Sequence, residues 1–313
     1  MVIAAVFPGQ GSQSIGMLAE LATEFPMVME TFAEASNLLD RDLWQIAQEG
    51  SEAVLNDTEN TQPIMLAAGI AVWRVWLAQG GCQPVAMAGH SLGEYSALVA
   101  SGALAFEDAV KLVQQRASLM KQAVPAGEGA MAAILGLDDQ TVIDLCKSAS
   151  AVGGLVEAVN FNSPGQVVIA GNSPTVDYAI ELAKEAGAKR AIKLAVSVPS
   201  HCALMRSAAE PLAATLRETD LLTPNLPVLH NINAENYDQV DHIRDALAQQ
   251  LYYPVRWVDT VQRLATDFQV DTVLEFGPGK VLFGLNRRIN KAMTPLCISD
   301  RKSLDKALTF CAA

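Results

Sequence analysis

The sequence of 313 residues is short of basic residues, paired cysteines and long apolar runs, and each shortage excludes a class of protein. It has 22 Lys and Arg against 34 Asp and Glu, and its formal net charge of -12 argues against nucleic acid as a partner. No uninterrupted apolar stretch reaches the roughly 18 residues that a membrane span needs. The first residues carry no basic segment of the kind that opens a signal peptide. We therefore expect a globular, cytoplasmic protein.

The cysteines form no pattern that binds metal or builds a disulfide framework. They are odd in number, scattered, and include no Cys-x-x-Cys pair: Cys82, Cys146, Cys202, Cys297 and Cys311. We predict reduced, mostly buried thiols and no metal site. Cys202 directly follows His201, and side chains adjacent in sequence usually point different ways, so Cys202 is a weak candidate for a nucleophile.

The stretch of residues 83–100 predicts a strand, a tight turn and a helix. Residues 85–88 are a short apolar run typical of a strand buried in a parallel sheet. Gly-His-Ser-Leu-Gly at 89–93 matches the Gly-x-Ser-x-Gly nucleophile elbow, which places Ser91 at a helix N-terminus. Backbone N–H groups and the helix dipole can stabilise an oxyanion there. The same residues also fit a capping box, in which Ser91 and Glu94 only satisfy backbone N–H groups.

The remaining pattern predicts an α/β fold in two parts. Residues 2–7 predict a strand, and the glycine-rich loop that follows lies where α/β sheets place ligand contacts. Between residues 124 and 196 the pattern becomes strand, helix, strand, strand, helix, strand, which is the order of a ferredoxin-like unit. We expect a large subdomain of residues 1–123 and 197–313 and an inserted small subdomain of residues 124–196.

An amphipathic helix is predicted over residues 106–123, with Arg116 on its apolar face. A guanidinium directed inward must find an anion or several acceptors, because burying it unpaired is costly. It could form a structural salt bridge, or extend its charged head back to solvent. It could also clamp a substrate carboxylate with two parallel hydrogen bonds. The helix pattern leaves these alternatives open.

A serine nucleophile needs a general base, and the chain has four histidines. His90 neighbours Ser91 and should point away from its hydroxyl, and His242 lies in a polar segment that we expect to be exposed. His230 ends an apolar strand and remains a candidate. His201 leads, because it lies at a proline-containing junction between subdomains, where a cleft is expected. Common α/β hydrolases place their histidine nearer the C-terminus, which weakens an esterase interpretation.

Together the motifs resemble a known family. In chain order they are Phe7-Pro-Gly-Gln-Gly-Ser-Gln13, Thr61-Gln-Pro63, Gly89-His-Ser-Leu-Gly-Glu94, Arg116, Asn160-Phe-Asn-Ser-Pro164, Val198-Pro-Ser-His201, Gln250-Leu-Tyr-Tyr-Pro254 and Phe276-Gly-Pro-Gly279. Over almost the entire chain they resemble the bacterial malonyl-CoA:acyl-carrier-protein transacylases. The resemblance implies an α/β-hydrolase-like large subdomain with a parallel sheet and a ferredoxin-like insert. It also implies transfer of malonyl from malonyl-CoA to acyl carrier protein, for fatty acid synthesis.

The resemblance further implies roles for the matching residues. Ser91 resembles the acyl-accepting nucleophile and His201 its base. Gln250 resembles the residue whose backbone carbonyl orients the histidine in place of an aspartate. The N–H groups of Gln10 and Leu92 resemble the oxyanion hole.

The resemblance also implies which residues contact the substrate. Arg116 resembles the clamp for the malonyl carboxylate, and Asn160 and Asn162 are looser candidates for lining the thioester channel. An acidic carrier protein and an acidic enzyme must meet through a local patch of opposite sign. We predict docking on the cationic group of the last helix, which is otherwise ordinary solvated surface: Arg287, Arg288 and Lys291.

The resemblance implies no resident cofactor, since the phosphopantetheine belongs to the partner, and we expect a monomer. Three other functions remain as alternatives: a serine esterase or thioesterase, an acyltransferase of polyketide synthesis, and a non-catalytic interaction domain.

Overall fold

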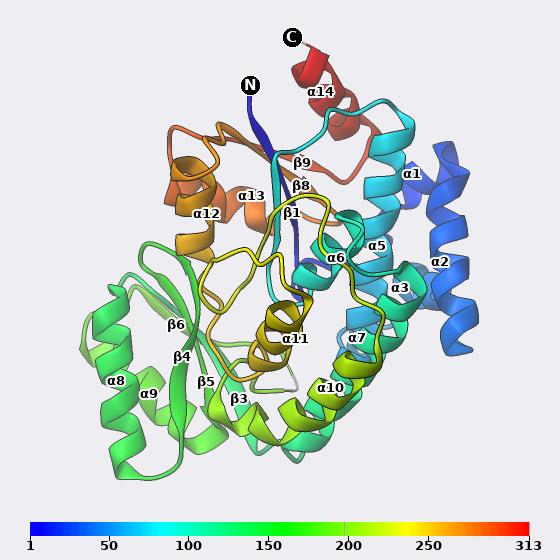
Figure 1. The fold of residues 1–313 in the computed structure, drawn as a ribbon. Coiled ribbons are helices and arrows are strands. Elements are labelled where there is room, and N and C mark those ends of the chain that lie inside the picture. Colours follow the sequence, from blue (N-terminus) through cyan, green and yellow to red (C-terminus); the bar gives the residue numbers. More distant parts are fainter. Residues whose placement is uncertain (197, 313) are drawn as a thin grey trace.

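Two sheets organise the chain, whose computed structural model describes residues 1–196 and 198–312 (Figure 1). The larger sheet is parallel, with strand order β7-β2-β1-β8-β9. Its strands are β1 (Ile3–Phe7), β2 (Ala86–Gly89), β7 (Val228–Leu229), β8 (Thr272–Phe276) and β9 (Thr294–Ile298). The predicted α/β fold with a parallel sheet is confirmed. The predicted boundaries at residues 197 and 313 lie outside the described residues.

Helices cover both faces of the parallel sheet, because alternate residues of a strand point to opposite sides. On one face Phe7 and Phe276 stack, with ring centroids 5.7 Å apart, and pack against the long helix α5 (Thr58–Ala78). On the other face, small and branched residues of the same strands pack against α12 (Trp257–Thr266) and α13 (Val281–Ile289). By length and composition α5 could cross a membrane, but 83% of its most apolar window is buried inside the protein. It is a core helix of this fold.

The other helices of the large subdomain surround this sheet (Figure 1). They are α1 (Ala19–Glu24), α2 (Pro26–Leu39), α3 (Leu43–Glu49), α4 (Glu52–Leu55), α6 (Gly93–Ala100), α7 (Phe106–Ala123), the short 3-10 helix η1 (Ala203–Met205), α10 (Arg206–Glu218), α11 (Val240–Gln249) and α14 (Arg301–Ala312). Helix α7 has the bounds that the amphipathic pattern predicts.

The small antiparallel sheet has strand order β4-β5-β3-β6, and two helices cover one of its faces. Its elements are β3 (Gly129–Leu135), α8 (Asp139–Val152), β4 (Val156–Ser163), β5 (Gln166–Asn172), α9 (Ser173–Glu185) and β6 (Arg190–Lys193). The predicted ferredoxin-like order is therefore present. The face that α8 and α9 leave uncovered carries Met131 and Val168, which line a cavity shared with the large subdomain.

Edge strand β4 joins the small sheet to the large subdomain. The N–H of Phe161 donates to the carbonyl of Val255 at 3.0 Å, and the N–H of Val255 donates to the carbonyl of Val159 at 2.8 Å. Two register shifts interrupt the pairing of β4 with β5, and the second skips Asn162. Bulges of this kind turn a side chain in a new direction. The second one directs Asn162 toward the large subdomain.

Two predictions about the C-terminal part of the chain are wrong. The helix that carries Arg287 and Arg288 is not the last, because β9 and α14 follow it, and Lys291 lies beyond its end. The strand predicted to lead up to His230 is reduced to the two residues of β7. Strand β7 lies at the edge of the sheet and is too short to show an alternating pattern, which explains the second error.

The prediction of reduced thiols is wrong for two cysteines. Cys82 and Cys311 form a disulfide, with Cα atoms 5.9 Å apart. The fold places the segment between α5 and β2 beside α14, a proximity that spacing in the sequence does not reveal. Cys146 and Cys202 are free and buried, and burial raises the pKa of each thiol to about 12. Cys202 is thus an inert thiol.

Candidate active site

The strand, turn and helix predicted around Ser91 are present. Strand β2 ends at Gly89, Ser91 turns the chain with a φ of 52°, and α6 begins at Gly93. A Cβ on Gly89 would lie 1.8 Å from the backbone carbon of Gly93, and a Cβ on Gly93 would lie 2.0 Å from the carbonyl oxygen of Phe7. The two glycines are therefore required by close packing, and Ser91 itself adopts the left-handed conformation.

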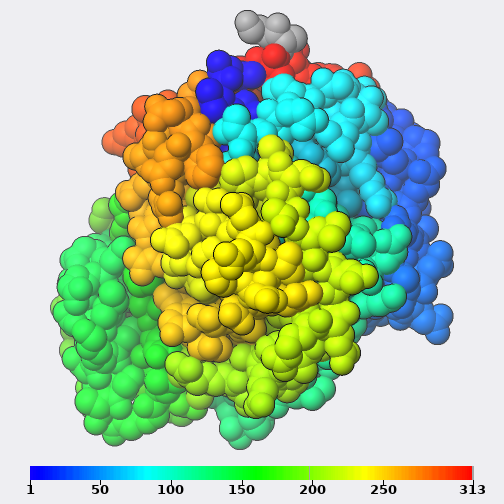
Figure 2. All heavy atoms as spheres, viewed as in Figure 1, coloured from blue at the N-terminus to red at the C-terminus, as the bar shows by residue number. Residues whose placement is uncertain are grey.

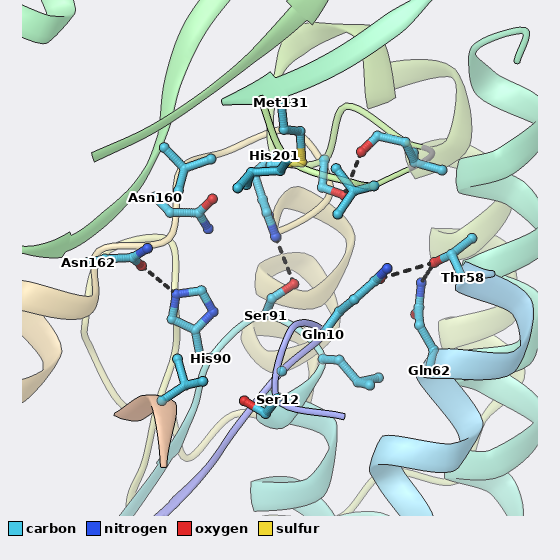
Figure 3. A pocket seen from close by; sticks show the side chains of 18 of the residues that line it. Gln10, Ser12, Thr58, Gln62, His90, Ser91, Met131, Asn160, Asn162 and His201 are labelled. Carbon is cyan, nitrogen blue, oxygen red and sulfur yellow. Dashed lines mark hydrogen bonds between the residues drawn. The ribbon is translucent and has the colours of Figure 1, made fainter. Parts of the chain in front are cut away.

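The hydroxyl of Ser91 points into the site and does not cap the helix. Its Oγ lies 2.7 Å from Nε2 of His201 (Figure 3). Helix α6 has no side-chain cap, and the Glu94 carboxylate accepts hydrogen bonds from three other residues: His230, Asn231 and Gln250. The capping-box interpretation is therefore wrong.

His201 is held as a neutral ring that can accept a proton. Its Nδ1 lies 2.7 Å from the backbone carbonyl oxygen of Gln250. Because a carbonyl can only accept, Nδ1 carries the proton and Nε2 is left to accept from the Ser91 hydroxyl. Burial, and then the positive charge of Arg116, lower the pKa of His201 to about 3. The unprotonated form prevails at neutral pH.

The other histidines do not reach Ser91. The ring of His90 points away from the hydroxyl, and its Nε2 lies 2.8 Å from Oδ1 of Asn162 (Figure 3). His230 is buried, hydrogen-bonded to Glu94 at 2.7 Å, and does not line the cavity. His242 is exposed, as predicted. The structure therefore brings His201, and not His230, to the serine.

Arg116 is a buried guanidinium held by neutral groups. It is 1% exposed, its Nη1 donates to Gln62 Oε1 at 2.7 Å, and its Nη2 donates to Gln250 Oε1 at 2.9 Å and to Ser91 Oγ at 3.3 Å. Among the described residues no carboxylate forms an ion pair with it, and its buried Nε has no partner. Both structural alternatives, a salt bridge and a charged head in solvent, are wrong. The positive charge of Arg116 therefore lies at the cavity wall, where a substrate anion can pair with it.

Two backbone N–H groups beside Ser91 are free to donate. Neither the N–H of Gln10 nor that of Leu92 makes a hydrogen bond to any residue that the structure describes. A Cβ on Gly9 would lie 2.4 Å from the carbonyl oxygen of His90, so the loop after β1 packs closely on the elbow. Gln10 and Leu92 line the same cavity of about 180 Å³ as Ser91. They can donate to an oxyanion formed at the serine.

Comparison with known proteins agrees with this geometry. The family model of the acyl transferase domain matches residues 5–292. A malonyl CoA-acyl carrier protein transacylase of Haemophilus influenzae is 54% identical over 308 residues, which cover 98% of each chain. The chain belongs to the malonyl CoA-acyl carrier protein transacylase family.

Solved structures of relatives share the whole fold of this transacylase-family chain. An acyl carrier protein S-malonyltransferase of Vibrio cholerae superposes with a TM-score of 0.94 at 52% identity, covering 98% of this chain and 99% of that one. A malonyl-transacylase solved in complex with a holo acyl carrier protein of a type II polyketide synthase superposes with a TM-score of 0.97. It is also 52% identical and covers 99% of this chain and 100% of that one.

Of the remaining residues predicted for this transacylase-family chain, the two asparagines line the cavity and the three basic residues do not. Asn160 and Asn162 line the cavity (Figure 3). Arg287, Arg288 and Lys291 are exposed and do not line it. The same helix reaches the cavity, since the first turns of α13 contribute Val281, Leu282 and Leu285 to the cavity wall. Arg288 also donates to Gln166 of β5 at 2.6 Å, which joins α13 to the small sheet.

Three side chains that hold the site carry no role predicted from the sequence, those of Gln62, Asn231 and Gln250, and Glu94 was predicted only as part of a helix cap. Gln62 lies within the Thr-Gln-Pro motif, which was a usable signal, whereas nothing marks Asn231 beyond its position after His230. Among the described residues, no group of three His, Cys, Asp or Glu side chains is placed to hold a metal ion.

Proposed function

We propose that this protein transfers the malonyl group of malonyl-CoA to the phosphopantetheine thiol of an acyl carrier protein, through a malonyl ester of Ser91. One observation carries this proposal: a buried arginine that pairs with no carboxylate of the described residues lies 3.3 Å from a serine hydroxyl, which is itself hydrogen-bonded to a neutral histidine. A free carboxylate on the acyl group fits that arginine. The names of the relatives and the carrier protein bound to a related enzyme support the same substrates.

In the first half-reaction Ser91 Oγ attacks the thioester carbonyl while His201 Nε2 takes its proton. The N–H groups of Gln10 and Leu92 stabilise the oxyanion of the tetrahedral intermediate. When the intermediate collapses, the C–S bond breaks, His201 returns the proton to the CoA thiolate, and malonyl-serine remains. The neutral carbonyl of Gln250 is sufficient to stabilise protonated His201 in this reaction. A thiolate leaving group needs less protonation than an amine leaving group does, so the histidine needs less stabilisation.

In the second half-reaction the thiol of the carrier protein attacks malonyl-Ser91 from the same side. His201 accepts the thiol proton and gives it to Ser91 Oγ as the ester bond breaks. The pantetheine thiols belong to the two substrates, so the proposed reaction uses no resident cofactor. We place the reaction in the cytoplasm and in fatty acid synthesis, with polyketide synthesis as the second candidate because a related structure contains such a carrier.

Transfer and hydrolysis are distinguished by where the malonyl group goes. With radiolabelled malonyl-CoA and holo-carrier protein, we expect label on the carrier protein and little free malonate. A thioesterase would release malonate at the same rate with or without the carrier. Running the reaction with carriers of fatty acid and of polyketide synthesis, and comparing kcat/KM, decides the pathway.

The cationic end of α13 is the proposed docking surface for the carrier protein. Among the described residues, Arg287, Arg288 and Lys291 form no ion pair with a carboxylate, so their charge is available to an acidic partner. Helix α13 packs against α12, and Figure 2 shows the orange surface around α12 beside the green small subdomain. We expect Arg287→Glu to raise KM for the carrier protein several-fold, with a smaller effect at high salt.

The control for docking is the first half-reaction. Acylation by malonyl-CoA alone should proceed at the rate of the unmodified protein. A parallel loss in both half-reactions would show that the substitution damages the fold, and the docking surface would then have to be sought elsewhere.

A further inference from the structure

The peptide groups on either side of Ser91 are held by two buried amide side chains. Asn231 Oδ1 accepts the N–H of Ser91 at 2.6 Å, and Asn231 Nδ2 donates to the carbonyl oxygen of Gly89 at 2.7 Å. Gln250 Nε2 donates to the carbonyl oxygen of Ser91 at 3.0 Å. The elbow is thus fixed by side chains that come from segments 140 or more residues later in the chain.

Glu94 supports both amides from behind. Its Oε2 accepts the backbone N–H of Asn231 and the side chain of Gln250, each at 2.9 Å, and its Oε1 accepts Nδ1 of His230 at 2.7 Å. Glu94, Asn231 and Gln250 are each no more than 1% exposed. A buried carboxylate with three donors is well satisfied, so this arrangement is rigid.

The elbow needs such support. Ser91 has a φ of 52°, which costs free energy for a residue with a side chain and persists only where the surroundings impose it. Asn231 also occupies the N–H of Ser91. The next N–H along the chain, that of Leu92, makes no hydrogen bond to any described residue and lies next to the Ser91 hydroxyl.

We propose that Asn231, supported by Glu94, is the positioning residue of the nucleophile. It holds the peptide of Ser91 so that the hydroxyl meets His201 and the Leu92 N–H meets the oxyanion. Asn231 does not line the cavity, so it acts through Ser91 and not on the substrate. This inference rests on the proposed function for its substrate, whereas the chemistry of the serine can be tested without it.

The test compares Asn231→Ala with the unmodified protein in three measurements. The first is the rate of Ser91 acylation by malonyl-CoA, followed by intact mass. The second is the rate of inactivation by phenylmethanesulfonyl fluoride, which reports the reactivity of Ser91 without a malonyl group. The third is the Kd of malonyl-CoA, measured in a Ser91→Ala background, where no acylation occurs.

We expect both rates to fall by roughly 10²-fold, the scale for a misplaced reacting group, while Kd changes less than about threefold. Asn231→Asp should recover most of the activity, because a protonated carboxyl in this buried place can accept from the Ser91 N–H and donate to the Gly89 carbonyl. Asn172→Ala is the matched control: Asn172 Oδ1 also accepts a backbone N–H, that of Leu155 at 2.8 Å, but Asn172 ends β5 of the small sheet and its side chain holds no peptide group of the elbow. It should lower Tm and leave both rates unchanged.

The inference is overturned if Asn231→Ala reacts at the unmodified rate at a temperature well below its Tm. It is also overturned if Kd rises in step with the loss of rate, since that would show damage to the cavity. Should Asn231→Ala fail to fold, Asn231→Ser, with one hydroxyl in place of two hydrogen-bonding atoms, takes the same tests. If the unmodified protein is not acylated by malonyl-CoA but does react with the sulfonyl fluoride, the proposed function fails while the inference stands.

Discussion

Replacing Ser91 by alanine is expected to abolish the malonyl adduct and leave the protein folded. The hydroxyl lies at the tip of the elbow, 2.7 Å from His201 Nε2 and 3.3 Å from Arg116 Nη2. It bonds to no backbone group of the described residues, so removing it deprives none of them of a partner. Intact-mass spectrometry after incubation with malonyl-CoA measures the adduct, and the thermal transition measures the fold. Ser101→Ala is the control, because Ser101 is a buried serine at the other end of α6. A malonyl adduct on the Ser91→Ala protein would contradict the mechanism.

His201→Ala and His230→Ala test the assignment of the base to the same nucleophile. Loss of a general base typically slows a reaction by roughly 10²–10⁴-fold, and we expect a loss of that size in acylation for His201→Ala. His230→Ala removes a donor to Glu94 and should act mainly on stability. If His230→Ala slows acylation more than His201→Ala at equal folded fraction, the base is misassigned.

Arg116→Ala is expected to change the selectivity for the acyl group and not only the rate. In the unmodified protein malonyl gains a charge-assisted pair of hydrogen bonds in a buried site, whereas acetyl brings no carboxylate to the guanidinium. The substitution should therefore cost malonyl transfer about 3 kcal/mol, the scale for a hydrogen bond to a charged group. Transfer of acetyl should hold steady or improve. The measurement is kcat/KM for malonyl-CoA and acetyl-CoA.

Two further variants separate the clamp from the scaffold. Arg116→Lys should recover little malonyl activity, because an ammonium cannot form the planar pair. Arg74→Ala is the matched control. The Arg116 guanidinium lies over the ring of Tyr95, 5.5 Å from its centroid, and the Arg74 guanidinium lies over the ring of Phe106 at 4.8 Å. Arg74 is paired with Glu34 and does not line the cavity. Arg74→Ala should lower Tm and leave the ratio of kcat/KM for malonyl-CoA to kcat/KM for acetyl-CoA unchanged. If malonyl and acetyl transfer decline in parallel in Arg116→Ala, Arg116 is structural.

The parts of the molecule that were predictable from the sequence are those set by local patterns. The elbow follows from two glycines and a buried strand, and α7 with its inward Arg116 follows from the helical period of apolar residues. The order of elements in the small subdomain also follows from alternating periodicities. The sequence favoured His201 over His230 as the base but could not decide between them, because the distance to Ser91 depends on how the two subdomains pack against each other.

The unpredicted parts depend on contacts between distant segments. Glu94 fits a helix cap by its spacing from Ser91, yet its partners lie 136 or more residues away. The side chain of Gln250 bridges Arg116 and Glu94, a role that no neighbouring residue signals. The disulfide between Cys82 and Cys311 spans 229 residues in the same way.

The hydrogen bonds between β4 and Val255 have a consequence for inhibition by a product. Val255 belongs to the segment whose Gln250 carbonyl fixes His201, so the small sheet cannot swing away from Ser91 without displacing the base. We therefore expect the cleft to keep its width during turnover, so that CoA and the arm of the carrier protein occupy the same cavity in turn. For the proposed malonyl-enzyme, we expect free CoA to compete with the carrier protein. Added CoA should then slow the second half-reaction.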